Sequence, residues 1–372
     1  MVTVEQRSSG RDNNFNLLRM LAATAVLISH SWPLSMGKNT IEPLFLETGY
    51  KLGTTAVSIF FAVSGFFITK SFLNRASLAD FALARIARIY PGLIVVLLLT
   101  VFVLGPLFTI LPLTAYFGDL HTWAYVPFNL TLKKMMWTLP GVFTDNPYGG
   151  PNGGAINGSL WTLFSEVSCY FMVVVISLLG LSRPAFFFII LAIAIGATFL
   201  IPQAEAGNLL RSSATLGLPF ALGAATYIYR RWIPVSGLLA AALVGLAALS
   251  FDTIFYPMMH AFAVAYASLW FGFANIPGLK SYNRLGDYSY GMYIYAFPVE
   301  QMTMALFHHL TPWQLALASF PPTLLLAFLS WTYIESPALS HRHILVARLR
   351  LRRMRQDCEL EPVAVKPANP TR

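Results

Sequence analysis

Charged residues are scarce in this chain of 372 residues. Only 11% are Asp, Glu, Lys or Arg, whereas 56% are hydrophobic and the mean hydropathy is +0.61. A soluble globular protein usually carries about a quarter charged residues, so the deficit argues against that class. The apolar residues gather in runs of roughly twenty, which is the length that crosses a hydrocarbon core of about 30 Å. We predict an all-α, polytopic transmembrane helical bundle, because a β-barrel would show short alternating segments instead.

Several chemical signatures are also missing. The chain has two cysteines, one in an expected span (Cys169) and one in the C-terminal tail (Cys358), so no disulfide framework is expected. Metal-ligand spacings, a nucleotide-binding glycine loop and a Gly-x-Ser-x-Gly elbow are all lacking. The adjacent His308 and His309 would diverge on a helix and make a poor metal pair. We therefore expect no metal site.

Ten apolar segments are long enough to be spans, and Pro and Gly residues mark most of their joints. They cover roughly residues 15–35, 52–73, 89–111, 159–180, 185–202, 209–229, 234–251, 253–274, 286–307 and 313–334. The first is too long for a cleaved signal peptide and is expected to be retained. The connection at 112–158 ends in the glycine-rich stretch "NPYGGPNGGAINGS", which fits either a mobile loop or a lid over a site.

The net charge of +9 is distributed in the way that sets membrane orientation. With a cytoplasmic N-terminus, ten spans place twenty of the 25 lysines and arginines on the cytoplasmic side and five outside. Both termini are then cytoplasmic. Residues 1–14 form an N-terminal segment, 15–337 the membrane domain and 338–372 a basic, disordered tail. The arginines between 348 and 355 indicate contact with anionic lipid, and no nucleic-acid binding is expected.

The first span carries two ionisable residues, Arg19 and His30, eleven positions apart. That spacing is almost three turns, so both side chains project from nearly one face, about 16 Å apart along the axis. Arg19 is expected near the cytoplasmic boundary, where it either has a functional partner or snorkels to headgroups. His30 is expected in the outer half, where an ionisable group usually faces a cavity or a partner.

Glu166, in "NGSLWTLFSEVSCYF", is the expected partner of His30. If its span starts near Ser159 on the outer side, Glu166 lies about 10 Å deep, at a depth similar to that of His30. A carboxylate beside an imidazole would suit the histidine to general-base work. The alternative is a buried polar pair that only locks two helices together.

A second pair, Arg85 and Arg88 in "RIARIYP", shares one helix face at the cytoplasmic boundary. Two guanidiniums there could clamp phosphates, or could simply anchor the helix to the inner leaflet. Glu335, in "YIESP" at the end of the last span, is expected to pair with one of these arginines.

Taken in order, these motifs resemble the acyltransferase 3 family of integral membrane acyltransferases. The resemblance runs from about residue 13 to residue 337. It rests on the Arg-x10-His pattern at Arg19 and His30, "FFAVSGF" from Phe60, Arg-x-x-Arg with "IYP", "SLWTLFSE", and "GDYSYGMYIYAFP" with "YIESP". One departure is Ala296, where many members have a histidine.

The resemblance implies transfer of an acyl group, often acetyl from acetyl-CoA, to a sugar hydroxyl. The acceptor would be an exported or cell-surface sugar or polysaccharide, and the enzyme would be a multi-pass protein of the bacterial inner membrane. Its partners would be acyl-CoA, the acceptor and the lipid bilayer. The competing hypothesis is a transporter or flippase for a lipid-linked or anionic sugar, which would use the same charged cavity without making bonds.

The resemblance also implies roles for particular residues. His30 matches the residue that the family treats as catalytic, and Arg19, Arg85 and Arg88 match residues regarded as essential. We accordingly predict three groups: catalytic His30 and Glu166; coenzyme-binding Arg19, Arg85 and Arg88; and acceptor-binding Asn157, Ser159 and Trp161.

Overall fold

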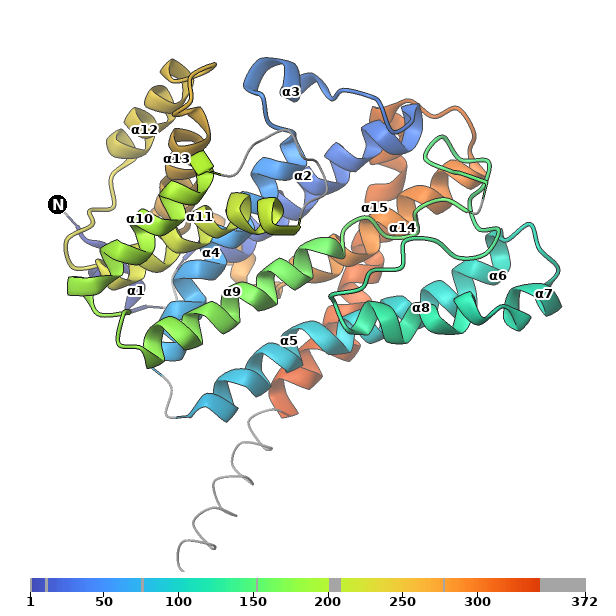
Figure 1. Cartoon of the computed structure of the whole chain (residues 1–372), viewed down its shortest axis with the longest axis horizontal. Helices are drawn as coiled ribbons and strands as arrows, with labels where there is room; N and C mark the ends of the chain where they lie inside the picture. The colour runs from blue at the N-terminus through green and yellow to red at the C-terminus, as the bar shows by residue number, and fades with distance from the viewer. Residues whose placement is uncertain are drawn as a thin grey trace, which may run out of the picture.

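The chain folds into a bundle of helices, and in the residues that the structure describes no strand is formed (Figure 1). The structure is a computed structural model. It describes residues 2–10, 13–74, 77–151, 153–200, 209–276 and 278–341. The all-α prediction is therefore confirmed. The predicted tail, with its arginine cluster and Cys358, falls almost entirely outside the described residues.

Each of the ten predicted segments contains a helix. The helices are α2 (Phe15–Met36), α4 (Leu52–Leu73), α5 (Leu78–Leu99), α9 (Trp161–Leu178), α10 (Pro184–Leu200), α11 (Leu209–Ile228), α12 (Gly237–Leu249), α13 (Tyr256–Phe273), α14 (Ser289–Leu306) and α15 (Pro312–Ser330). Within the described ranges, five helical stretches are long and apolar enough to cross a bilayer, and three shorter helices are also apolar. The chain is thus built as a membrane protein. The count of ten spans and the side of each terminus stay predictions.

Short helices fill the connections. They are α1 (Val4–Ser8), α3 (Pro43–Thr48), α6 (Gly105–Phe108), α7 (Leu113–Gly118), α8 (Leu120–Leu130) and the 3-10 helix η2 (Leu279–Arg284). Two π-helical turns, η1 (Thr100–Leu104) and η3 (Trp331–Glu335), follow α5 and α15. In Figure 1, α8 folds back and lies beside α5 and the π-helical turn η1 that continues it. The N-terminal α1 docks through Val4, whose amide donates to Ile233 O over 2.9 Å.

The third span begins eleven residues earlier than predicted, at Leu78 instead of residue 89. Ser77 caps its first turn by accepting a hydrogen bond from the Asp80 amide. Pro91 lies inside the helix. A proline removes one hydrogen bond but need not end a helix whose apolar face is buried. Arg85 and Arg88 consequently stand within α5 and point into the bundle.

The central helix is α14, which is buried along nearly its whole length. It packs against α15, α2 and α5. The glycine-rich segment before α9 also packs on it: the Asn146 amide donates to Gln301 O over 2.9 Å, and Gln301 Nε2 donates to Ala155 O over 2.7 Å. This segment is therefore part of the packed bundle and covers one end of α14.

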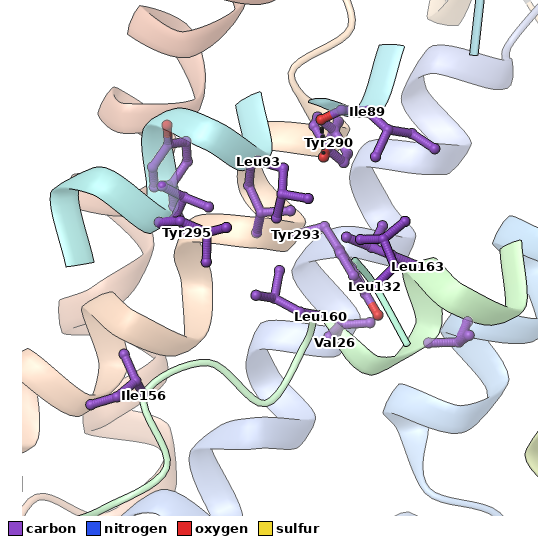
Figure 2. Packing of buried hydrophobic residues seen from close by; sticks show 14 of the residues in the cluster. Val26, Ile89, Leu93, Leu132, Ile156, Leu160, Leu163, Tyr290, Tyr293 and Tyr295 are labelled. Carbon is purple, nitrogen blue, oxygen red and sulfur yellow. Dashed lines mark hydrogen bonds between the residues drawn. The ribbon is translucent and has the colours of Figure 1, made fainter. Parts of the chain in front are cut away.

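The largest apolar cluster joins segments that are far apart in sequence. Figure 2 shows side chains of α2, α5, α9 and α14 gathered together, among them Val26, Leu93, Leu163 and Tyr293. Ile156, from the segment before α9, belongs to the same cluster. The cluster holds these helices at fixed positions around the cavities described next. Within a bilayer such a cluster is stabilised mainly by close van der Waals packing, because lipid tails are as apolar as the side chains themselves.

Candidate functional site

Two cavities lie along α2. The arginine cavity, of about 440 Å³, is lined by Arg19, Arg85, Arg88, Glu166, Tyr170 and Asp287 among others. The His30 cavity, of about 870 Å³, is lined by His30, Lys38, Glu42, Lys51, Trp137 and Trp161 among others. Both volumes fall in the range of small-molecule and cofactor sites. Arg19 and His30 thus open into different cavities although they share one helix.

Arg19 of α2 and Arg88 of α5 meet at one carboxylate, that of Asp287. Arg88 Nη2 lies 2.6 Å from Asp287 Oδ2, and Arg19 Nη1 lies 3.4 Å from the same oxygen. Ser289 Oγ donates to Oδ1 over 2.5 Å. Two guanidinium groups and a serine hydroxyl thus surround this carboxylate, and their charges and hydrogen bonds favour its ionised form. The ionised carboxylate therefore ties α2, α5 and the start of α14 together.

Glu335 pairs with Arg88 from the opposite side, which confirms the predicted pairing with one of these arginines. Its Oε2 lies 3.6 Å from Arg88 Nη1, and its Oε1 accepts a hydrogen bond from Ser330 Oγ over 2.9 Å. Glu335 is fully buried and stands at the end of the π-helical turn η3. Such turns widen a helix and re-aim its side chains, often at functional sites.

Gly286 makes the close approach at this corner possible. Its φ is +108°, in the region that favours glycine, and a Cβ would lie only 2.5 Å from Trp331 Nε1. Trp331 in turn lies beside Arg88, whose guanidinium carbon is 5.9 Å from its ring. The glycine of the "GDYSYG" motif thus lets Asp287 reach the arginines.

Arg85 is the least engaged of the three arginines. Its buried Nε has no hydrogen-bond partner in the described part of the chain. Its guanidinium carbon lies 5.7 Å from the ring of Tyr170 and 5.9 Å from that of Phe81. Tyr170 in turn donates a close hydrogen bond to Glu166, one turn earlier on α9. Arg85 therefore has an unused N–H donor at Nε, beside an aromatic ring and near a carboxylate.

His30 is half-buried in the wall of its cavity. Its Nδ1 is buried without a hydrogen-bond partner among the described residues. The imidazole packs edge-to-face on Phe297 of α14, with ring centroids 5.1 Å apart. Gly158 makes room there, because a Cβ would come within 2.4 Å of the Phe297 ring. An imidazole without a carboxylate partner is free to exchange a proton with a bound molecule.

The two cavities have two lining residues in common, Val57 of α4 and Tyr293 of α14. Tyr293 is held in place because its hydroxyl hydrogen-bonds with Thr162 Oγ1 over 2.7 Å and its ring packs edge-to-face on Phe60. Figure 2 shows Tyr293 within the apolar cluster. The cavities therefore adjoin at an apolar junction, between the arginines and His30.

The predicted contact between His30 and Glu166 is wrong. The two residues line different cavities, and no hydrogen bond or ion pair joins them in the described structure. The depth estimate assumed that the helix starts at the outer surface. In fact Ser159 and Leu160 are buried, so α9 begins inside the protein and carries Glu166 past the junction into the arginine cavity.

Of the three predicted acceptor residues, only Trp161 lines the His30 cavity. Asn157 is buried and its amide is fully used, donating to Ile294 O over 2.8 Å and accepting from the Ser159 amide over 3.1 Å. Ser159 is buried and its Oγ has no partner among the described residues. Asn157 and Ser159 therefore position the start of α9, whereas Trp161 is exposed to a bound molecule.

Sequence reasoning missed several lining residues. Asp287 was quoted in a motif but given no role, although its neighbouring glycine was a signal. Tyr170 stands four residues after Glu166, a helical spacing that predicts contact. Tyr293 and Lys51 had no signal, because only the fold brings them to the cavities.

Comparison with known proteins agrees with this geometry. The sequence model of the acyltransferase domain that defines the acyltransferase 3 family matches residues 12–332. An O-acetyl transferase of Shigella phage Sf6 is 28% identical over 339 residues, covering 89% of this chain and 97% of the relative. Nodulation protein 10 of Rhizobium leguminosarum bv. viciae is 28% identical over 377 residues, covering 92% and 97%. No solved structure matches. With a family match over nearly its whole membrane region, the chain belongs to the acyltransferase 3 family of membrane acyltransferases and is an enzyme of its O-acetyltransferase type.

Proposed function

We propose that the protein transfers an acetyl group from cytoplasmic acetyl-CoA to a hydroxyl of an exported or cell-surface sugar or polysaccharide. One observation carries the proposal: a basic cavity and a histidine-bearing cavity adjoin at Val57 and Tyr293. Donor and acceptor can then approach from opposite ends. A phage and a bacterial relative support a bacterial inner-membrane location.

The arginine cavity is the donor end in this proposal. Phosphates bind guanidinium groups through charge-assisted, often bidentate hydrogen bonds. Arg85 and Arg19 can donate hydrogen bonds to the phosphates. Arg88 is paired with two carboxylates and holds the surrounding helices together. Glu166 acts here, through Tyr170, by orienting Arg85. From this end the pantetheine arm runs past Tyr293 toward His30, and Arg19 and His30 are about 16 Å apart along α2, which suits such an arm.

The His30 cavity is the acceptor end. Its aromatic walls, including Trp137, Tyr148 and Trp161, suit the apolar faces of a sugar ring, and its polar side chains suit the hydroxyl groups. His30 takes the proton of the acceptor hydroxyl as the oxygen attacks the thioester carbonyl. The new C–O bond forms and the C–S bond breaks. The coenzyme thiolate leaves with the electron pair and takes up the proton that His30 received.

The test is acetyl-CoA-dependent release of free CoA by the purified protein in detergent, with and without a glycan acceptor. We expect release that requires the acceptor and is lost in His30→Ala, while expression is retained. Acceptor-dependent mass increases of 42 Da in the glycan would confirm the product. If no CoA is released but the sugar crosses the membrane of proteoliposomes that contain the protein, the transporter hypothesis is supported instead.

A further inference from the structure

Two lysines line the His30 cavity without a carboxylate partner. Lys38 follows the end of α2 and Lys51 precedes α4. Both are exposed, and neither makes an ion pair with a described residue. The Lys38 ammonium lies 5.2 Å from the ring centroid of Tyr148, another lining residue, so a cation–π contact keeps it at the cavity. The cavity thus holds two ammonium groups with hydrogen-bond donors to spare.

The one lining carboxylate among the described residues, that of Glu42, is already occupied. Glu42 is only 4% exposed. Its Oε2 accepts from Ser29 Oγ over 2.5 Å, and its Oε1 accepts a close hydrogen bond from the Leu52 amide. These bonds fasten the segment between α2 and α4 to both helices. Glu42 therefore serves the protein's own packing and is not paired with Lys38 or Lys51.

The placement of these lysines is selective. The topology predicted from the sequence leaves only five basic residues on the outer side, and two of them line this one cavity. A further two, Lys133 and Lys134, do not line it. Two of the five outer basic residues therefore stand at the acceptor cavity, where their charges favour a ligand of opposite charge.

We infer that the acceptor is an anionic glycan whose carboxylate or phosphate is held by Lys38 and Lys51 while a hydroxyl lies at His30. This inference rests on the proposed function. Lys38 lies beyond the end of α2, and from His30 to that end at Met36 the helix rises about 9 Å. Lys51 lies nearer to His30, because it adjoins Leu52, which Glu42 ties to Ser29. An ammonium is a point charge without the planar fork of a guanidinium, and it can donate hydrogen bonds to either a carboxylate or a phosphate.

The first experiment does not need acetyl transfer. The purified protein is methylated with formaldehyde and a mild reductant, and the rate at each lysine is read by mass spectrometry. Methyl glucoside, methyl glucuronide and glucose 6-phosphate are added in parallel. We expect the two anionic sugars to slow methylation of Lys38 and Lys51 several-fold relative to methyl glucoside. Lys134, which is also exposed and also lies over an aromatic ring, should react at an unchanged rate and is the internal control.

Comparison of the glucuronide and phosphate arms identifies the preferred anion. Equal rates at Lys38 and Lys51 with neutral and anionic sugars would overturn the inference. If protection is seen but no sugar is acetylated, the proposed function fails and the anion site stands.

The second experiment measures acetyl transfer to the same sugars. The wild type should prefer the anionic sugars by about tenfold, as two partly exposed charge contacts would provide. The preference should fall toward one in Lys38→Gln/Lys51→Gln and persist in the matched control Lys134→Gln. A preference that survives in the double variant would place the selecting charge elsewhere and refute this assignment.

Discussion

Replacing Arg88 by Met should cost stability first, before any effect on the coenzyme is considered. The side chain of Glu335 is fully buried and would be left with only the Ser330 hydroxyl. Asp287 would keep Arg19 and Ser289. Removing one partner of a buried ion pair typically costs about 3–5 kcal/mol, because the other charge is left uncompensated. Since one of the two carboxylates keeps a cation, we expect about 3 kcal/mol for Arg88→Met.

The assay is equilibrium unfolding in mixed micelles of a mild detergent and SDS, in which far-UV circular dichroism monitors the loss of helix. Arg85→Met is the matched control, because Arg85 stands one turn away on the same helix and has no ion pair in the described structure. It should lose much less unfolding free energy. In Arg88→Met/Glu335→Gln the uncompensated charge is removed, so part of the loss should return, with a coupling energy of about 1–3 kcal/mol.

The reasoning fails if Arg88→Met unfolds with the wild-type free energy and loses acetyl-CoA affinity as Arg85→Met does. Arg88 would then be a ligand-binding residue, and its two carboxylate contacts would contribute little to stability. It also fails if the double variant is no more stable than Arg88→Met, because Glu335 would not be the group left uncompensated.

Four further outcomes are expected. His30→Ala should lower acetyl transfer at least about a hundredfold, yet leave acetyl-CoA affinity by calorimetry unchanged, because His30 and the arginines occupy different cavities. Arg85→Lys should weaken acetyl-CoA binding by about tenfold although the charge is kept, and raised salt should weaken it further. Gly286→Ala should lower the unfolding free energy by about 1–3 kcal/mol, because of its positive φ and the nearby Trp331 Nε1. Tyr293→Ala should widen the junction and raise the rate with butyryl-CoA relative to acetyl-CoA by about tenfold, whereas Tyr293→Phe should not.

Each of these outcomes has a clear contradiction. Near-normal turnover in His30→Ala would remove it as the base. Unchanged acetyl-CoA affinity in both Arg85→Lys and Arg85→Ala would show that Arg85 only anchors its helix to the inner leaflet. A wild-type unfolding curve for Gly286→Ala would show that the backbone near Trp331 can accommodate a Cβ without strain. An unaltered acyl preference in Tyr293→Ala would place the acyl path away from the junction.

Much of the fold follows from the sequence, because the bilayer leaves an apolar segment few options. The apolar runs predicted where the ten long helices lie, and α4 matches its predicted bounds of 52–73. The start of the third span was placed at residue 89 because the residues before it carry charges, whereas α5 begins at Leu78. The pairing of Glu335 with an arginine was also predicted, since a carboxylate at the end of a span needs a cation nearby.

The sequence by itself determined which residues are candidates for the chemistry, because charges are too costly in a membrane to be scattered freely. The tertiary structure alone decided which of them meet. Spacing along α2 placed Arg19 and His30 on one helix, but only the packing of α4, α9 and α14 separates them into two cavities. Glu166 lies in the arginine cavity instead of beside His30 because α9 starts inside the protein, a depth that residue counting cannot supply. Lys38, Lys51 and Tyr293 reach the cavities through contacts between distant segments, which no local pattern encodes.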